Sequence, residues 1–201
     1  TSILVSALAD DSVAVRTLAA RSLGQIGPPA VAASPRLIEL LKDVDETVRC
    51  QAADSLGRIG GDETATIAAL AELLSDASAA VKTSAALALG ALKQAAAPAV
   101  SALVPLLQDR DDSVRTAAAE AIAQVGPLSE SATNTLAEGL ASPDTVVRAQ
   151  TAKALGTIGS AAGEATPALV AAMTDENDRV RAESVQALGK IGESAAIAAV
   201  P

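Results

Sequence analysis

The sequence predicts an all-α protein, and within that class an α-solenoid that winds as a right-handed superhelix of six two-helix repeats. The first observation is a basic residue that recurs every 33 positions. This column consists of Arg16, Arg49, Lys82, Arg115, Arg148 and Arg181. The second observation is a valine directly before each of these residues and a leucine or isoleucine seven residues after it. The third is that no insertion or deletion interrupts the period.

We therefore expect a single repeat domain over residues 1–201. Its expected repeats are 1–33, 34–66, 67–99, 100–132, 133–165 and 166–198, and residues 199–201 form the stub of a further repeat. The chain starts without Met and stops at Pro201, so we expect a trimmed piece, and whether it comes from a longer array stays open.

The first helix of each repeat is predicted by two apolar residues one turn apart, as in Leu4 and Leu8 or Leu37 and Leu41. A spacing of four residues places both side chains on one face of a helix. In the fourth repeat Pro105 falls inside this helix, and we expect it to kink the helix there.

A short polar turn follows, and its third residue is in every repeat a preferred helix N-cap type. These residues are Ser12, Asp45, Ser78, Asp111, Asp144 and Asn177. The turn also holds 13 of the 24 acidic residues, because free N–H groups and the helix dipole favour negative charge there. The acidic clusters 109–112 and 175–178 therefore indicate helix capping rather than a calcium site. The twelve-residue calcium-binding loop, with its glycine and terminal glutamate, is missing.

The second helix shows apolar residues at a 4-4-3 spacing, in the first repeat at Val15, Ala19, Leu23 and Ile26. It is expected to end at a glycine, because the residue after a helix often adopts left-handed backbone angles. The expected stops are Gly27, Gly60, Gly126, Gly159 and Gly192. The third repeat has Lys93 instead, and there we expect a longer helix or a looser turn.

A second glycine column lies inside this helix. It consists of Gly24, Gly57, Gly90, Gly156 and Gly189, with Ala123 in the fourth repeat. Glycine in a helix costs roughly 1 kcal/mol relative to alanine. Its recurrence therefore predicts that a neighbouring helix passes close by.

Composition excludes several kinds of chemistry. The chain has no His, so it lacks the base of Ser-His-Asp and Cys-His mechanisms and every His-ligated metal site. Its single cysteine, Cys50, excludes an internal disulfide and a cysteine-based zinc site, and its column is otherwise small and neutral, which favours a packing role. No aromatic residue is present to stack on bases, and the net charge of −9 argues against nucleic acid. We expect no metal and no cofactor.

The motif Asp43-x-Asp45-x-x-Val48-Arg49-x-x-Ala52-Ala53-x-x-Leu56-Gly57-x-Ile59-Gly60 recurs with small variations in all six units. It resembles the HEAT-like repeat of the phycobilisome-lyase type. The resemblance implies an armadillo-like helical fold and, for most members, a role as a protein-binding scaffold. It also implies that Asp and Arg columns bond between neighbouring turns. We call this set the Arg–Asp ladder: Asp10, Arg16, Asp43, Arg49, Asp76, Lys82, Asp109, Arg115, Arg148, Asp175 and Arg181.

The variable columns of the second helix lie away from its apolar stripe. The resemblance implies that they line a concave face. We expect partner contacts at Leu18, Gln51, Asp54, Arg58, Ser84, Leu87, Ala91, Ala117, Glu120, Gln150 and Lys153. Leu87 lies among small residues where other repeats carry charge, so it predicts an apolar patch rimmed by charged side chains.

The sequence thus predicts a non-enzymatic protein-interaction scaffold with a protein or peptide partner. One alternative is a chromophore lyase subunit or chaperone like the phycobilisome lyases, and another is an engineered or consensus-like repeat protein. No apolar run is long enough for a membrane span and no signal peptide is visible, so a cytoplasmic location without a membrane partner is favoured. The repeats at both ends carry apolar stacking residues, and we expect self-association through them at high concentration.

Overall fold

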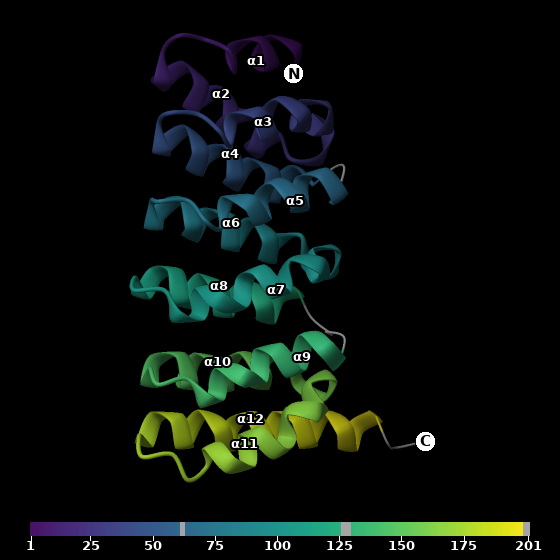
Figure 1. Cartoon of the computed structure of the whole chain (residues 1–201). Coiled ribbons are helices and arrows are strands. Elements are labelled where there is room, and N and C mark those ends of the chain that lie inside the picture. Colours follow the sequence, from purple (N-terminus) through teal and green to yellow (C-terminus); the bar gives the residue numbers. More distant parts are fainter. Residues whose placement is uncertain (61–62, 126–129, 199–201) are drawn as a thin grey trace. The chain divides into compact units, whose positions relative to one another are not determined.

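The structure is a computed structural model that describes residues 1–60, 63–125 and 130–198. Over these residues it contains α-helices and short 3₁₀ helices, and no strand. Figure 1 shows them as successive helix pairs. The chain divides into two compact units, Thr1–Ala102 and Leu103–Pro201, called unit 1 and unit 2 below.

Unit 1 contains the first three helix pairs. Its elements are α1 (Ser2–Ala7), α2 (Val13–Ile26), the 3₁₀ helix η1 (Pro28–Ala33), α3 (Ser34–Leu40), α4 (Glu46–Ile59), α5 (Glu63–Leu73), α6 (Ala79–Ala91) and the 3₁₀ helix η2 (Lys93–Ala99). The second helices of these pairs, α2, α4 and α6, pack side by side in chain order. α7 (Val100–Leu103) follows at the border of the two units.

Unit 2 repeats the arrangement. It holds η3 (Val104–Gln108), α8 (Asp112–Val125), α9 (Glu130–Ala137), η4 (Glu138–Ala141), α10 (Thr145–Ile158), η5 (Gly159–Ala165), α11 (Thr166–Ala172) and α12 (Asp178–Ala198). Here α10 packs between α8 and α12. In the first helix of the fourth repeat, the α-helical turns stop at Leu103 and 3₁₀ turns begin at Val104, beside Pro105, which has no N–H to donate.

The core of each unit consists of the predicted apolar columns. Leu23, Leu37 and Leu56 are fully buried in unit 1, and Leu136 and Leu155 are fully buried in unit 2. Each such leucine contributes about 1.5–3 kcal/mol when it leaves water. Because alanine fills most other inward positions, the helices approach closely and the core is thin.

The predicted N-caps are confirmed where the side chain is Asp or Asn. The Asp45 carboxylate accepts the N–H of Thr47 at 2.8 Å, and that of Asp144 accepts the N–H of Val146 at 2.7 Å. Asp111 and Asn177 make equivalent bonds at 2.9 and 3.0 Å. Ser12 and Ser78 occupy the same position without a side-chain cap bond. There the helix start is held by the carboxylate two residues earlier, which accepts the serine N–H at 2.8 Å in both turns.

Three of the predicted glycine stops are confirmed. Gly27, Gly60 and Gly159 end α2, α4 and α10 with φ of 71°, 69° and 71°. Gly126 lies outside the described residues. The predicted stop at Gly192 is wrong, because α12 continues through it to Ala198. The residues after Gly192 include two alanine pairs, and their high helix propensity offsets the cost of the glycine.

Of the two alternatives expected at Lys93, a longer helix or a looser turn, the longer helix does not form. α6 ends at Ala91, and Lys93 itself adopts the left-handed conformation, with φ of 54°. A residue with a Cβ pays roughly 1–2 kcal/mol for these angles. Lys93 therefore takes the left-handed backbone conformation that glycine adopts at the end of the second helix in other repeats.

Gly24, Gly57 and Gly156 of the second glycine column mark close helix contacts, as predicted, whereas a Cβ on Gly189 would meet open space. A Cβ on Gly57 would lie 2.8 Å from the Cα of Ala88, and one on Gly156 would lie 2.8 Å from the Cα of Ala187. A Cβ on Gly24 would lie 2.7 Å from the Ser55 Oγ. In each case the glycine faces a small residue 31 positions later, on the next second helix. This contact fixes how closely successive second helices approach within a unit.

Candidate functional site

The candidate site is the outward side of the second helices, which we call the second-helix face. In unit 1 it includes Leu18, Arg21, Gln51, Asp54, Arg58, Ser84, Leu87 and Ala91, and in unit 2 Ala117, Glu120, Gln124, Gln150, Lys153, Thr157, Arg179, Glu183, Gln186 and Lys190. Every residue that the sequence analysis assigned to partner contact belongs to this face. The inward side of the same helices carries the glycine column and the core leucines, so packing leaves the face available.

In unit 1 the face presents two exposed leucines. Leu18 on α2 is 60% exposed and Leu87 on α6 is 40% exposed. Arg58 and Ala91 are also exposed, while Gln51, Asp54 and Ser84 are half-buried. Leu87 is therefore an exposed apolar side chain among half-buried polar side chains of α4 and α6.

Ser84 on α6 is a hydrogen-bonding neighbour of both Asp54 and Cys50 on α4. Burial raises the pKa of Cys50, and the bond with Ser84 offsets this only in part. Burial likewise raises the pKa of Asp54. A thiol with a raised pKa is a poor nucleophile at neutral pH.

In unit 2 the face contains a groove of about 270 Å³ between α8 and α10. Its floor consists of Ala119, Ala123 and Ala154, and its walls carry Glu120 and Gln124 from α8 and Lys153 and Thr157 from α10. Gln150 also lines it. A volume of this size accommodates one amino-acid side chain of a partner.

Two of the residues predicted for partner contact are buried rather than exposed. Ala117 is 3% exposed and Gln150 is 6% exposed. Both belong to the column of Leu18, which is 60% exposed, so exposure in this column differs between repeats. The Oε1 atom of Gln150 is buried and has no hydrogen-bond partner among the described residues, so this amide is an unsatisfied polar group beneath the groove.

The groove follows from one irregularity in the glycine column. The register that sets Gly24 against Ser55 and Gly156 against Ala187 would set Ala123 against Ala154. A Cβ cannot occupy a position 2.8 Å from another backbone atom, so α8 and α10 must stay further apart than α10 and α12. Both alanines line the groove that results. The sequence analysis noted Ala123 as a departure but did not infer a groove from it.

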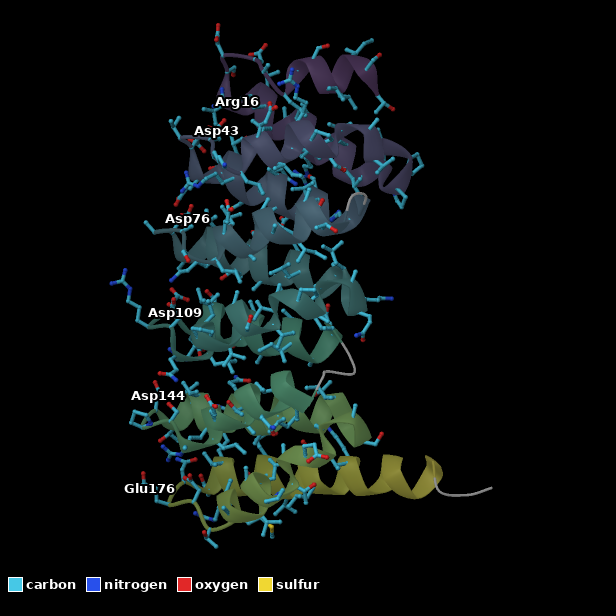
Figure 2. All side chains as sticks on the ribbon, turned by 45° about the vertical axis from the view of Figure 1, so that its right-hand side comes forward. Arg16, Asp43, Asp76, Asp109, Asp144 and Glu176 are labelled. Atoms are coloured by element: carbon cyan, nitrogen blue, oxygen red, sulfur yellow. The ribbon has the colours of Figure 1, made fainter. Side chains whose placement is uncertain are left out.

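The Arg–Asp ladder lies at the N-terminal ends of the second helices. In unit 1 Arg16 Nε donates to Asp43 at 2.7 Å, and Arg49 Nε donates to Asp76 at 2.8 Å. A second guanidinium N–H completes a bidentate pair at 3.0 Å in both cases. Figure 2 shows Arg16, Asp43 and Asp76 following one another along the edge of unit 1.

Each ladder arginine also bonds to its own turn. Arg49 Nη1 donates to the carbonyl oxygen of Asp43 at 2.9 Å, and Arg16 Nη1 donates to that of Asp10 at 2.9 Å. The guanidinium therefore joins its own turn to the turn of the next repeat. Because these pairs are largely buried in the turns, the ladder holds neighbouring repeats together and presents little charge for binding.

Unit 2 has one complete ladder step. Arg148 Nε donates to Asp175 at 2.7 Å, whereas the column position 27 residues after Arg115 holds Ser142 in place of Asp. Arg115 bonds to the carbonyl of Asp109 at 2.7 Å and to Asp112 at 3.0 Å, but its Nε is buried without a partner among the residues that the structure describes. Arg181 donates to the carbonyl oxygens of Asp175 and Glu176.

Three of the ladder carboxylates, those of Asp43, Asp76 and Asp175, have shifted pKa values. For Asp43 and Asp76 burial alone would raise the pKa, but the arginine pair and a backbone N–H outweigh it, so the pKa of each lies below its ordinary value. The hydrogen bond from Arg148, followed by that from the Asn177 N–H, lowers the pKa of Asp175. These groups stay ionised at neutral pH and serve as acceptors.

Two further observations concern the part of the chain that the structure describes. No group of three His, Cys, Asp or Glu side chains is placed so as to hold a metal ion. No helix there has both the length and the apolar character that crossing a bilayer requires.

Known proteins resemble the chain in fold. An engineered protein of known crystal structure shares 26% identity with a TM-score of 0.66, over 95% of this chain and 96% of that chain. A second engineered protein shares 27% identity with the same TM-score, over 95% and 98% of the two chains. A designed armadillo repeat protein, solved in complex with the peptide (KR)4, has 22% identity and a TM-score of 0.64 over 94% and 98%. This last likeness concerns the fold alone.

Among the curated proteins compared with the chain, none matches. The family model of HEAT repeats matches residues 1–90, 67–146 and 133–200. The predicted all-α solenoid class is confirmed by this match and by the engineered repeat structures. Because the matched segments span nearly the whole sequence and follow its 33-residue period, the chain belongs to the HEAT repeat family.

Proposed function

We propose that this HEAT repeat chain is a non-enzymatic scaffold for protein–protein interaction, and that its second-helix face binds a partner polypeptide. The observation that carries the proposal is the contrast between the two sides of the second helices. The inward side repeats the same small and apolar residues, whereas the outward side changes from repeat to repeat and exposes Leu87 in unit 1. A surface that varies on a fixed framework suits recognition of a particular partner.

The designed armadillo repeat protein supports the proposal in one respect. It was solved in complex with a peptide, so a helical repeat fold of this type can hold a peptide. A groove of about 270 Å³ on the same side of unit 2 is large enough for one side chain of such a peptide.

The scarcity of residues suited to acid–base and nucleophilic catalysis supports a non-enzymatic role. The chain contains no His, and its one thiol, Cys50, has a raised pKa. The motif from Asp43 to Gly60 also resembles the phycobilisome-lyase type of HEAT-like repeat, and this resemblance suggests an alternative function. A lyase subunit would bind a bilin, and a spectral shift of added bilin would favour that alternative.

Selection of peptides from a random displayed library on the immobilised chain tests the proposal. Recovered peptides would then be measured against Leu87→Glu and against Val44→Glu, a matched control at a turn position that is 94% exposed. We expect a subset of peptides to lose about 1 kcal/mol or more of affinity with Leu87→Glu and to be unaffected by Val44→Glu. The proposal fails if no selected peptide responds to any substitution on the second-helix face.

A further inference from the structure

The second-helix face has the opposite charge sign to the whole chain. The net charge is −9, yet the face carries five cations, Arg21, Arg58, Lys153, Arg179 and Lys190, against three acids, Asp54, Glu120 and Glu183. These five are the majority of the nine basic residues outside the ladder column. Burial also raises the pKa of Asp54, which weakens the negative charge of unit 1 at this face.

None of the five cations forms an ion pair within the described residues, in contrast to the ladder arginines Arg16, Arg49 and Arg148. All five are exposed. An exposed cation that forms no ion pair is available to a carboxylate of another molecule, although Arg58 also lies near Asp54. Such pairs set the sign of the partner that a surface accepts.

The acidic turns lie far along the helix from two of these cations, whereas Arg179 directly follows the turn residue Asp178. In α10, Lys153 follows the capping Asp144 by nine residues, which corresponds to about 13 Å along a helix. In α12, Lys190 follows Asp178 by twelve residues, or about 18 Å. Both separations exceed the screening length of about 8 Å at physiological salt. Within unit 2 the face carries three cations against two acids, and its part around Lys153 and Lys190 acts locally as a basic surface on an acidic protein.

Within unit 2 the groove supplies hydrogen-bond donors beside these cations. The amide groups of Gln124 and Gln150 line it together with Lys153. The register of α10 and α12 is fixed by the contact of Gly156 with Ala187 and by the Arg148–Asp175 pair, so the outward columns of the two helices lie next to each other. Glu120 on the α8 wall is the one acid at the groove.

We propose that the second-helix face of unit 2 binds an acidic peptide segment, with a carboxylate side chain entering the groove between α8 and α10 beside Lys153. This inference rests on the proposed scaffold function and adds the charge of the partner. It differs from the peptide in the designed armadillo structure, which is basic. A nucleic acid fits less well, because its phosphates extend along the whole strand and would also meet the acidic turns, and the chain has no aromatic residue on which a base could stack.

The test uses the whole chain and three labelled octapeptides, (DE)4, (KR)4 and the neutral (SG)4, in a fluorescence-polarisation assay at two salt concentrations. The variants are Lys153→Glu, Lys190→Glu and the double substitution. Arg110→Glu is the matched control, because it makes the same charge change at an exposed turn position of unit 2. Thermal melts of all variants establish that each one is folded.

We expect (DE)4 to bind more tightly than (SG)4, and the double variant to raise its Kd by at least about tenfold. Arg110→Glu should change the Kd by less than about twofold. Glu120→Gln should strengthen binding of (DE)4, because it removes the one opposing charge at the groove. Added salt should weaken all of these differences.

The inference is overturned if (DE)4 does not bind, whereas (KR)4 binds and loses affinity with Glu120→Gln. The scaffold proposal would survive that result, since the same face would still hold a peptide. If no probe responds to any of these face variants and no library peptide does so either, both proposals fail. Displacement of (DE)4 by an equal concentration of a single-stranded oligonucleotide would also overturn the inference, because the preferred occupant would then be a nucleic acid.

Discussion

The Nε of Arg49 lies 2.8 Å from a carboxylate oxygen of Asp76, which is 27 residues further along the chain and belongs to the next repeat. The same guanidinium donates to the carbonyl of Asp43, six residues earlier. One side chain therefore ties two consecutive turns together. The other basic residues of the ladder differ in whether they make both of these contacts, the carboxylate pair and the carbonyl bond.

We expect Arg49→Ala to lower the thermal midpoint more than Arg115→Ala, and Arg115→Ala more than Arg110→Ala. Arg49 loses a bidentate carboxylate pair and its carbonyl bonds, whereas Arg115 has only contacts within its own turn. Arg110 is an exposed turn residue outside the column. Differential scanning calorimetry of the three variants checks this order, and equal losses for Arg49→Ala and Arg115→Ala would contradict it.

Ser142→Asp should stabilise the chain. The new carboxylate would stand in the ladder column and accept the Nε of Arg115, which is buried without a partner within the described residues. We expect a gain of about 1 kcal/mol, or about 2–4 °C in the midpoint. The gain should vanish in the Arg115→Ala background, and a gain that persists there would show that the new carboxylate acts elsewhere.

Gly57→Ala and Gly189→Ala should have opposite effects although both replace a helical glycine of the same column. A Cβ on Gly57 would lie 2.8 Å from the Cα of Ala88, so α4 and α6 must move apart, at a cost of about 1–3 kcal/mol. A Cβ on Gly189 has no described atom within 4 Å, so alanine there adds helix propensity worth up to about 1 kcal/mol. Urea unfolding of both variants measures the difference, and destabilisation by both would rule out the close-contact explanation.

Lys93→Gly should stabilise the chain by about 1 kcal/mol, because φ at this position is 54° and glycine adopts such angles without a Cβ clash. Lys93→Ala is the control that removes the side chain but keeps the Cβ, and it should bring no gain. If both variants gave the same change in the urea midpoint, the charge of Lys93 rather than its backbone angle would be the cause.

The folded chain should become less stable in acid, because protonation removes the charge of the ladder carboxylates. Asp43, Asp76 and Asp175 have pKa values below their ordinary range in the folded state. The stability that their ionisation contributes is present above the unfolded pKa of about 3.9 and is lost as the pH falls below it. Thermal midpoints between about pH 7 and pH 2 measure the loss. Replacing all three residues by Asn should flatten the curve on its acid side.

Asp54 supplies a control of opposite sign for the pH experiment. Its pKa is raised by burial, so its ionisation opposes folding as the pH rises through the shifted value. Asp54→Asn should therefore leave the midpoint at neutral pH unchanged or higher. A marked loss at neutral pH would mean that the ionised carboxylate stabilises the contact with Ser84.

The sequence allowed the repeat framework to be predicted because both partners of each framework contact lie in repeating columns. Asp45 caps its helix and Gly57 faces Ala88 for reasons that recur in other repeats. The 3₁₀ helices η1, η2 and η5 were not predicted, since they carry no apolar period of their own. The continuation of α12 past Gly192 was missed because local helix propensity outweighed the column rule at that position.

The candidate site could be predicted only in outline. The outward columns were apparent from the sequence, but burial of Gln150 and the groove beneath Lys153 depend on the separation of two helices. That separation depends on Ala123 and Ala154, which are 31 residues apart and become neighbours only after folding. A rule that compares each glycine-column residue with the residue 31 positions later would have located the groove.

The ladder described above joins residues that are either six or 27 positions apart, as Arg49 is from Asp43 and from Asp76. These two separations add up to the period of 33 residues. A gene segment of that length can therefore be duplicated or lost within the array, and a ladder arginine still finds one carbonyl behind it and, where the next turn carries the column Asp, one carboxylate ahead. Unequal recombination could lengthen or shorten such a chain without a single compensating substitution, and the length of the array is free to change faster than its framework.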